Sequence, residues 1–133
     1  MTGETDLSIL LASMSPVLLD QEFVFLSFKD ARYGDYAQLE PIAAFLESEG
    51  LTLVVSKAIA DSHALAYESI FKAITLEVHS SLDAVGLTAT FATKLSDGGI
   101  SANVIAAYYH DHIFVQSCDA DRAIIALKQL TTL

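Results

Sequence analysis

The sequence contains very little cysteine, proline or tryptophan. Of its 133 residues one is cysteine, two are proline and none is tryptophan. A single cysteine, Cys118, excludes an internal disulfide framework and a zinc site built on several thiolates. We expect Cys118 to be a small buried side chain rather than a reactive one.

Positive charge is also scarce. Seven lysines and arginines stand against seventeen acidic residues, which gives a formal net charge of −10. A surface that binds nucleic acid or an anionic membrane needs clustered Lys and Arg. We therefore expect neither nucleic acid nor membrane as a partner.

No long hydrophobic run is present. The best apolar window, Ile100 to Tyr109, is ten residues long and ends in a His-Asp-His sequence, whereas a membrane-spanning helix needs about 20 apolar residues. No basic segment precedes Leu7, so we expect no signal peptide and a cytoplasmic location.

Hydrophobic residues, in contrast, are abundant, at 53% of the chain against 18% charged residues. This composition excludes disorder and predicts a globular protein. The length suits one ordinary domain or two very small ones that share a core.

Several short elements are expected in the N-terminal half. Helical spacing of leucines predicts a helix over 6–14, with Asp6 as its cap and Pro16 beyond its end. Apolar residues on both faces predict a covered strand over 22–28. The polar stretch 29–41 is predicted to be a loop, and we favour a solvated connector over a functional loop.

Gly50 marks a turn between two apolar segments. We predict a β-hairpin of 42–48 and 51–55 around Glu49-Gly50. The alternative is a helix from Glu40 to Glu49 that ends at Gly50. A short helix is expected to follow over 56–65, with Ser56 as its N-cap.

The C-terminal half alternates between strand and helix patterns. Two of its strands return on each other at His110-Asp111, and the strand over 100–109 is expected to be buried on both faces. The expected elements are a strand over 71–79, a helix over 82–96, strands over 100–109 and 112–118, and a helix over 119–130.

This order suggests an α+β fold built from two ferredoxin-like βαββαβ units, residues 1–68 and 69–133. Each unit lacks one strand. Sharing or exchange supplies it most simply: the 71–79 strand ends one unit, and an N-terminal strand closes the other. We expect antiparallel sheets with helices on one face, and therefore a second sheet face that self-association would cover.

The junction at residues 79–87 has features of a ligand site. Ser80 and Asp83 match a capping box, which explains both residues structurally. Gly86 is not explained in this way, because a glycine in the first turn of a helix costs about 1 kcal/mol relative to alanine. Close packing or a ligand near the main chain would compensate, and free helix N–H groups suit a carboxylate.

A family resemblance adds to this interpretation. The Leu82–Ala89 stretch, the Gly99-Ile100-Ser101 turn with its hairpin, and the following Asp-Ala-Asp-Arg-Ala helix resemble the ACT domain. ACT domains are small regulatory modules that bind amino acids. The whole chain resembles a stand-alone bacterial protein with two ACT-like domains in tandem, and is similar in outline to the ACT modules of aspartate kinases.

The resemblance implies a ligand site where the strand–helix junction meets a neighbouring strand. Backbone amides near Gly86 would hold a carboxylate, and Asp83 or Asn103 would hold an ammonium group. The implied ligand residues are Ser81, Asp83, Val85, Gly86 and Leu87 from the junction, with Asn103, Val104 and Ile105 from the strand.

Other chemistry has less support. His110, Asp111 and His112 could ligate a metal, but the sequence supplies no clear third and fourth ligand, so we favour a solvated turn and expect neither metal nor cofactor. No nucleophile elbow and no phosphate-binding glycine pattern occurs.

We therefore expect a non-catalytic sensor of a small molecule, most simply an amino acid, that acts as a homo-oligomer, a dimer or tetramer. The alternative is a structural or protein-interaction module with no ligand.

Overall fold

A computed structural model describes residues 6–77 and 86–131. The chain forms two compact units. Unit 1 comprises residues 1–19 and 72–133, and unit 2 comprises residues 20–71. The predicted units, residues 1–68 and 69–133, were defined along the sequence, whereas these two units are defined by contacts between residues. The predicted division therefore stays a prediction.

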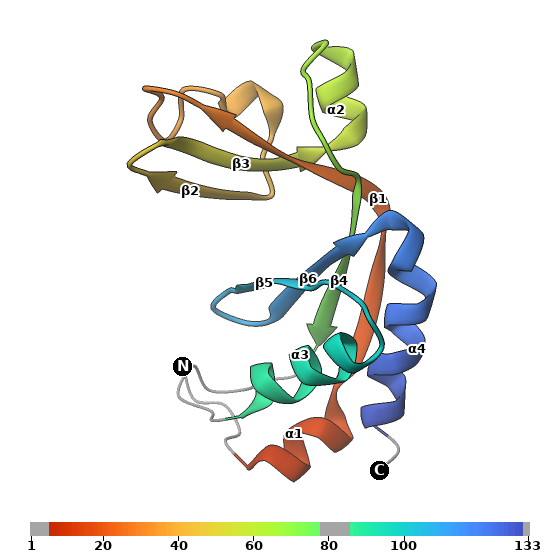
Figure 1. Cartoon of the computed structure of the whole chain (residues 1–133). Helices are drawn as coiled ribbons and strands as arrows, with labels where there is room; N and C mark the ends of the chain where they lie inside the picture. The colour runs from red at the N-terminus through yellow and green to blue at the C-terminus, as the bar shows by residue number, and fades with distance from the viewer. Residues whose placement is uncertain (1–5, 78–85, 132–133) are drawn as a thin grey trace. The chain divides into compact units, whose positions relative to one another are not determined.

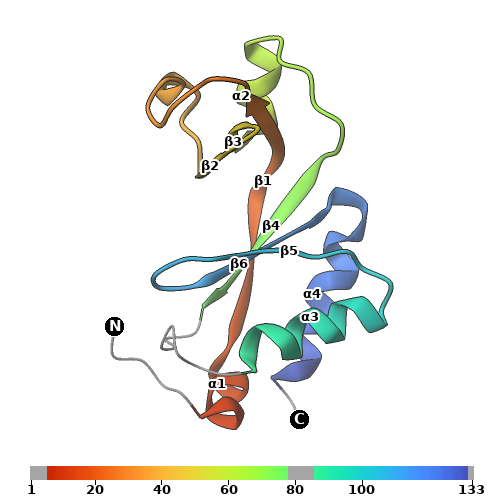
Figure 2. The ribbon, with the colours of Figure 1, turned by 60° about the vertical axis from the view of Figure 1, so that its left-hand side comes forward.

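Two strands pass from one unit into the other. β1 (Ser15–Phe28) crosses the boundary after Leu19, and β4 (Phe71–Glu77) crosses it after Phe71. They are hydrogen-bonded neighbours and run side by side in Figures 1 and 2.

This exchange completes both units. The strand order in unit 1 is β1-β4-β6-β5, where β5 is Asn103–Ala106 and β6 is Asp111–Gln116. In the N-terminal ferredoxin-like set of strands the order is β4-β1-β3-β2, where β2 is Ala43–Glu47 and β3 is Gly50–Ser56. Both orders follow the ferredoxin-like arrangement in which the fourth strand lies beside the first and the second strand is at the edge. The predicted α+β fold with exchanged strands is confirmed.

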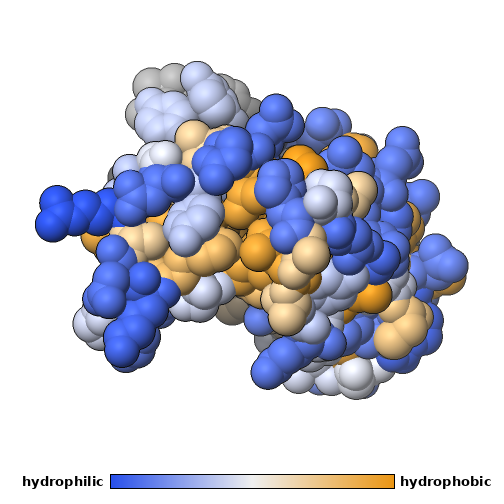
Figure 3. Space-filling model, turned by 90° about the horizontal axis from the view of Figure 1, so that it is seen from above, coloured by the Kyte–Doolittle hydropathy of each residue, from blue (hydrophilic) through white to orange (hydrophobic). Residues whose placement is uncertain are grey.

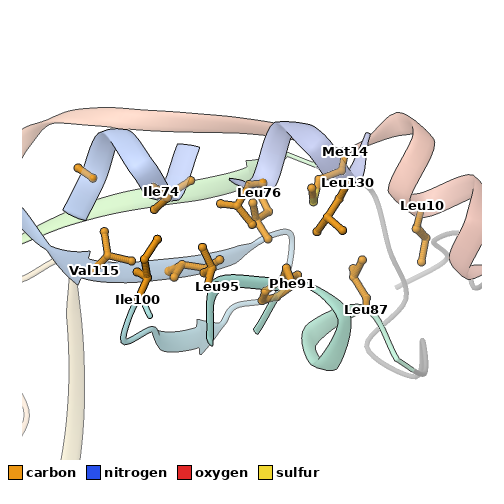
Figure 4. Close-up of a cluster of buried hydrophobic side chains, with 14 residues drawn as sticks. Leu10, Met14, Ile74, Leu76, Leu87, Phe91, Leu95, Ile100, Val115 and Leu130 are labelled. Atoms are coloured by element: carbon orange, nitrogen blue, oxygen red, sulfur yellow. The ribbon is translucent and has the colours of Figure 1, made fainter. Parts of the chain in front are cut away.

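The helices of unit 1 are α1 (Leu7–Ser13), α3 (Leu87–Asp97) and α4 (Ala120–Leu130). One hydrophobic core joins these helices to one face of the strands, as Figure 4 shows. Ile74 and Leu76 of β4 point into this core, together with Phe91 and Leu95 of α3. Helices on one face of the sheet are thus confirmed for unit 1.

The start of the chain folds as expected at its helix but not at its strand. The side chain of Asp6 caps α1 by accepting hydrogen bonds from the N–H groups of Ser8 and Ile9. The strand that follows begins at Ser15, so the predicted limits of 22–28 were too short. Pro16 is tolerated because it lies at the start of the strand, where a missing N–H is accepted.

Unit 2 contains the predicted hairpin. Strands β2 and β3 pair in antiparallel register, with Phe45 opposite Thr52 and Glu47 opposite Gly50, so the alternative helix was wrong. A Cβ on Gly50 would lie 3.0 Å from the carbonyl oxygen of Phe28, which explains the need for glycine at this turn.

The remaining helices of unit 2 are short. Helix α2 (Lys57–Ser62) begins at the predicted N-cap, where the Ser56 hydroxyl accepts a hydrogen bond from the N–H of Ile59. A single 3₁₀ turn, η1 (Ala37–Leu39), lies within the polar loop 29–41. A second hydrophobic core fills this unit, with Val24, Leu26, Leu39, Leu51, Leu53, Val55 and Ala60 among its buried residues.

Strand β5 differs from expectation. It spans four residues, of which Asn103 and Ala106 are exposed and Val104 and Ile105 are half-buried. The predicted burial on both faces was therefore wrong for the isolated chain. The reason is its position: β5 is the edge strand beside β6, where one side has no neighbouring strand to cover it.

Large apolar side chains also reach the surface. Figure 3 shows hydrophobic residues exposed among hydrophilic ones on the face seen from above. The exposed large hydrophobic residues are Ile9, Tyr33, Ile42, Phe45, Leu46, Tyr108, Tyr109 and Ile125.

Candidate functional site

Within the described residues α3 begins at Leu87, not at the predicted residue 82. Gly86 is the N-cap of α3 rather than a residue of its first turn, and its φ is +92°. This left-handed conformation is readily adopted by glycine and rarely by other residues. Among the residues that the structure describes, a Cβ at Gly86 would meet only the Leu7 side chain, at an ordinary 3.4 Å. Backbone conformation, rather than close packing, therefore explains this glycine.

The carbonyl of Gly86 anchors the first turn of α3. It accepts hydrogen bonds from the Thr90 N–H at 2.9 Å and from the Thr90 hydroxyl at 2.7 Å. Glycine has no side chain with which to cap the helix, and no acidic residue lies in the first turn. The first amides of α3 thus lack the N-cap side chain that usually satisfies them, an arrangement that suits a carboxylate.

Leu87 can contribute only its main chain to such a site. Its side chain is 3% exposed and belongs to the core of unit 1. Three other junction residues of the predicted site, Ser81, Asp83 and Val85, lie outside the described residues, as do Ser80 of the expected capping box and His79.

The strand side of the predicted site lies on β5. The Asn103 amide nitrogen donates a hydrogen bond to the carbonyl of Phe114, its partner across the strand pair, at 3.2 Å. This bond fixes the amide plane, so the Asn103 side-chain oxygen is directed away from Phe114 and can accept a hydrogen bond from an ammonium group.

Val104 and Ile105 occupy opposite faces of β5 because side chains alternate along a strand. Val104 packs against the same core that contains Leu87, so the two sides of the predicted site border one core. Ile105 is half-buried on the other face.

Two histidines lie at the β5–β6 turn. His112 Nδ1 lies 3.0 Å from the Thr75 hydroxyl on β4, so this nitrogen has a partner within the protein. His110 Nδ1 is buried and has no hydrogen-bond partner among the described residues. Within residues 6–77 and 86–131, no group of three His, Cys, Asp or Glu residues is placed to hold a metal ion.

Burial shifts the pKa values of His112 and Asp111 at this turn. It lowers the pKa of His112, with a smaller contribution from His110, while Asp111 opposes the shift. Burial also raises the pKa of Asp111, against the opposing effect of both histidines. Each shift disfavours the charged form, as expected for groups partly removed from water.

Cys118 is exposed, so the expectation of a buried cysteine was wrong. It lies in η2 (Ser117–Asp119), a 3₁₀ helix of one turn that joins β6 to α4. Cysteine is usually buried, but in a short connection between two elements the backbone path, and not the residue type, determines whether the side chain is exposed.

Two surface depressions in unit 2 were not predicted. One, of about 430 Å³, lies between the loop after β1 and the β2–β3 turn, and its lining includes Asp30, Arg32 and Glu47. The other, of about 260 Å³, lies at the start of α2, and its lining includes Lys57 and Asp61. Neither carries a motif, and in each the lining combines residues of the N-terminal part of the unit with residues from later in its sequence.

The second depression is bordered by an ordered polar cluster. Lys57 Nζ lies 2.8 Å from Asp61 Oδ2, and the Tyr67 hydroxyl donates to Asp61 Oδ1 at 2.7 Å. These two hydrogen bonds, that from Lys57 first, lower the pKa of Asp61. Because Lys57 and Asp61 satisfy each other, the cluster holds the α2 region together and leaves little free charge for a ligand.

No helix in the part of the chain that the structure describes has the length and apolar character needed to cross a membrane.

Solved structures with the same fold come from several bacteria. A Vibrio cholerae protein, described as being of unknown function and as a possible transport protein, is 53% identical. The alignment covers 94% of this chain and 95% of that one, with a TM-score of 0.86. No curated protein matches the chain.

Two more distant structures share the fold only. A protein from Agrobacterium tumefaciens has a TM-score of 0.69 at 14% identity, with 89% of each chain covered. The regulatory subunit of aspartate kinase from Thermus thermophilus has a TM-score of 0.61 at 11% identity, with 88% of this chain and 95% of that one covered.

Family sequence models give the most specific result. One model of the ACT domain matches residues 2–72, and a second matches residues 68–129. Together they cover nearly the whole chain, in the tandem arrangement that the resemblance implied. The chain therefore belongs to the ACT domain family.

Proposed function

We propose that this protein is a regulatory module that binds a free amino acid at the start of α3. Membership of the ACT family supports a regulatory, ligand-binding role, since ACT domains are regulatory and not catalytic. The observation that carries the proposal is the start of α3, where Gly86 supplies no capping side chain and the first turn carries no acid.

The carboxylate of the ligand would bind the first amides of α3. These N–H groups point out of the helix and carry the positive end of its dipole, so an anion is stabilised there. Gly86 and Leu87 contribute main-chain groups to this part of the site. Ser81, Asp83 and Val85 are proposed to complete it from the preceding junction.

The ammonium group would bind on the strand side. The side-chain oxygen of Asn103 is available to accept a hydrogen bond, because the amide nitrogen is held by the Phe114 carbonyl. Asp83 is the second proposed acceptor. Ile105, which shares a face of β5 with Asn103, would border the side chain of the ligand and set its size. Val104 packs against the core on the other face and would contribute its main chain.

Isothermal titration calorimetry against the twenty common amino acids tests this proposal. At least one should bind, and Asn103→Ala should weaken that binding by about tenfold, which corresponds to the loss of one hydrogen bond to a charged group. Ser101→Ala is the matched control, because Ser101 is exposed and lies just before β5. Equal binding by both variants would exclude Asn103 from the site.

A module that binds only a protein partner is the second candidate. Tyr108 and Tyr109, at the tip of the β5–β6 hairpin, are 54% and 65% exposed, and exposed tyrosines are common in protein interfaces. This candidate predicts no heat with any amino acid, and a partner whose binding is lost on Tyr108→Ala or Tyr109→Ala.

We further propose that the protein is a homo-oligomer, which would cover part of the exposed apolar surface. Neither a cofactor nor a metal is part of the proposal.

A further inference from the structure

The outer strand of unit 2 and the residue before it carry an unusual set of exposed apolar side chains. β2 is the edge strand of its sheet. Phe45 and Leu46 of β2 are 68% and 44% exposed, and Ile42, just before the strand, is 47% exposed. No charged residue occurs in β2 before Glu47. An uncharged apolar edge strand is a ready template for pairing with another chain, and natural proteins normally protect it.

The N–H of Leu46 does not face β3. It donates a hydrogen bond to the hydroxyl of Tyr33 at 2.8 Å. Because backbone groups alternate in direction along an antiparallel strand, Phe45 and Glu47 bond to β3 while Ala44 and Leu46 point to the free edge. The Tyr33 hydroxyl therefore occupies one of the few outward donors of β2.

A tight turn holds Tyr33 in this place. The N–H of Asp35 donates to the Arg32 carbonyl at 3.0 Å, and the Asp35 carboxylate accepts from the Arg32 N–H at 2.8 Å. Gly34 supplies the third position of the turn with a φ of +94°, which glycine adopts without strain. The turn thus presents the phenol from outside the sheet.

The other end of the edge is protected by a bulge. The N–H of Ile42 donates to the Val54 carbonyl at 2.8 Å, although the register pairs Val54 with Ala43. Two residues of this segment therefore face one residue of β3, which turns the Ile42 N–H inward. The N–H groups of Ile42 and Leu46 both have hydrogen-bond partners. Among the described residues of this edge, Ala44 is therefore the one whose N–H can bond to another strand.

We infer that Tyr33 guards the β2 edge and prevents its pairing with the β2 strand of a second copy of this chain. The strand that would pair with this edge is β2 of the second copy. In an antiparallel self-pair centred on Ala44, apolar residues lie opposite apolar residues. Glu47 lies opposite Pro41 rather than opposite a second acid, so no like charges meet. This protection of the edge does not depend on ligand binding.

Removing one hydroxyl tests the guard. Tyr33→Phe keeps the ring and removes the acceptor, which frees the Leu46 N–H. Tyr36→Phe is the matched control: Tyr36 lies on the same loop and stacks on Phe28 with ring centroids 3.8 Å apart, so loss of its hydroxyl leaves the edge unchanged. Circular dichroism melting of each variant shows that the fold is retained.

Two measurements report pairing of the β2 strands: the mass of the protein in solution and a disulfide cross-link at position 44. In a Cys118→Ser background, the substitution Ala44→Cys reports whether two β2 strands meet under mild oxidation. For Tyr33→Phe we expect a disulfide between the thiols introduced in two copies, and a roughly doubled mass in sedimentation without oxidation. Neither change is expected for Tyr36→Phe or for the protein with Tyr33 intact. Cross-linking with Tyr33 intact, or no difference between the two Phe variants, would overturn the inference.

Discussion

The hydroxyl of Thr90 donates a hydrogen bond to the carbonyl of Gly86 at 2.7 Å, and this contact fixes the first turn of α3. Gly86 itself has a left-handed φ of +92°, a conformation that residues with a side chain adopt rarely. The start of α3 is thus held in one conformation while its first amides stay free of an N-cap side chain. If an anion binds these amides as proposed, a first turn already held by this hydrogen bond reduces the conformational entropy lost on binding.

The two ends of α3 should respond differently to alanine. Gly86→Ala should lower the free energy of unfolding by about 1–2 kcal/mol, because alanine is strained at a φ of +92°. Gly98→Ala, at the other end with a φ of −84°, should change it by no more than about 0.5 kcal/mol. Urea denaturation measures both. Equal losses would show that the φ of Gly86 is not the constraint.

The core of unit 1 should depend strongly on Phe91. This side chain is fully buried among the helices and β4, so Phe91→Ala should cost about 3–5 kcal/mol through lost transfer energy and a cavity. Thr93→Ala, at an exposed position of the same helix, α3, should change the free energy of unfolding by less than about 0.5 kcal/mol. A small effect of Phe91→Ala would contradict the described core.

Stability should fall on mild acidification because of His112. Burial lowers its pKa in the folded state, so below the ordinary value of about 6.5 the unfolded chain binds more protons. The free energy of unfolding should therefore decrease as pH falls from about 7 towards the folded-state pKa. His112→Gln should flatten this slope in urea titrations at several pH values.

His63→Gln is the control for that experiment. His63 is exposed in unit 2, and the slope measured for its variant shows what replacing a histidine by glutamine does away from the β5–β6 turn. An unchanged slope in His112→Gln would remove His112 as its source.

Self-association should be visible without any ligand. Tyr108 and Tyr109 at one hairpin tip and Ile125 on α4 are more than half exposed, and an oligomer would bury such side chains. Sedimentation velocity at micromolar protein should give a dimer or tetramer. A monomer across that range would contradict the proposed homo-oligomer.

Much of the fold could be predicted because it depends on local signals. Asp6 and Ser56 cap helices α1 and α2 as their positions implied, and Gly50 marks the hairpin. The exchange of strands could be predicted because each predicted unit contained one strand fewer than the ferredoxin-like fold needs. In the structure β4 completes the N-terminal set of strands and β1 completes the C-terminal set.

Other features depend on partners that lie far away in the sequence. The early part of β1 shows no strong strand pattern, yet hydrogen bonding to β4 extends the strand back to Ser15. β5 has an apolar sequence, but its place at the edge leaves Asn103 exposed. Neither position in the sheet can be deduced from residues within the strand.

The candidate site shows the same division. Gly86 could be singled out because glycine is costly near a helix start, but its left-handed φ became evident only from the backbone. The bond from Asn103 to the Phe114 carbonyl depends on strand register. The contact of Tyr33 with Leu46 depends on a loop that carried no motif.

The most direct test of the proposed function is calorimetric titration of the intact protein with each of the twenty amino acids at concentrations up to millimolar. We predict saturable heat with at least one of them, and weaker binding for Asn103→Ala than for Ser101→Ala. The absence of heat with all twenty would contradict amino-acid binding by this protein.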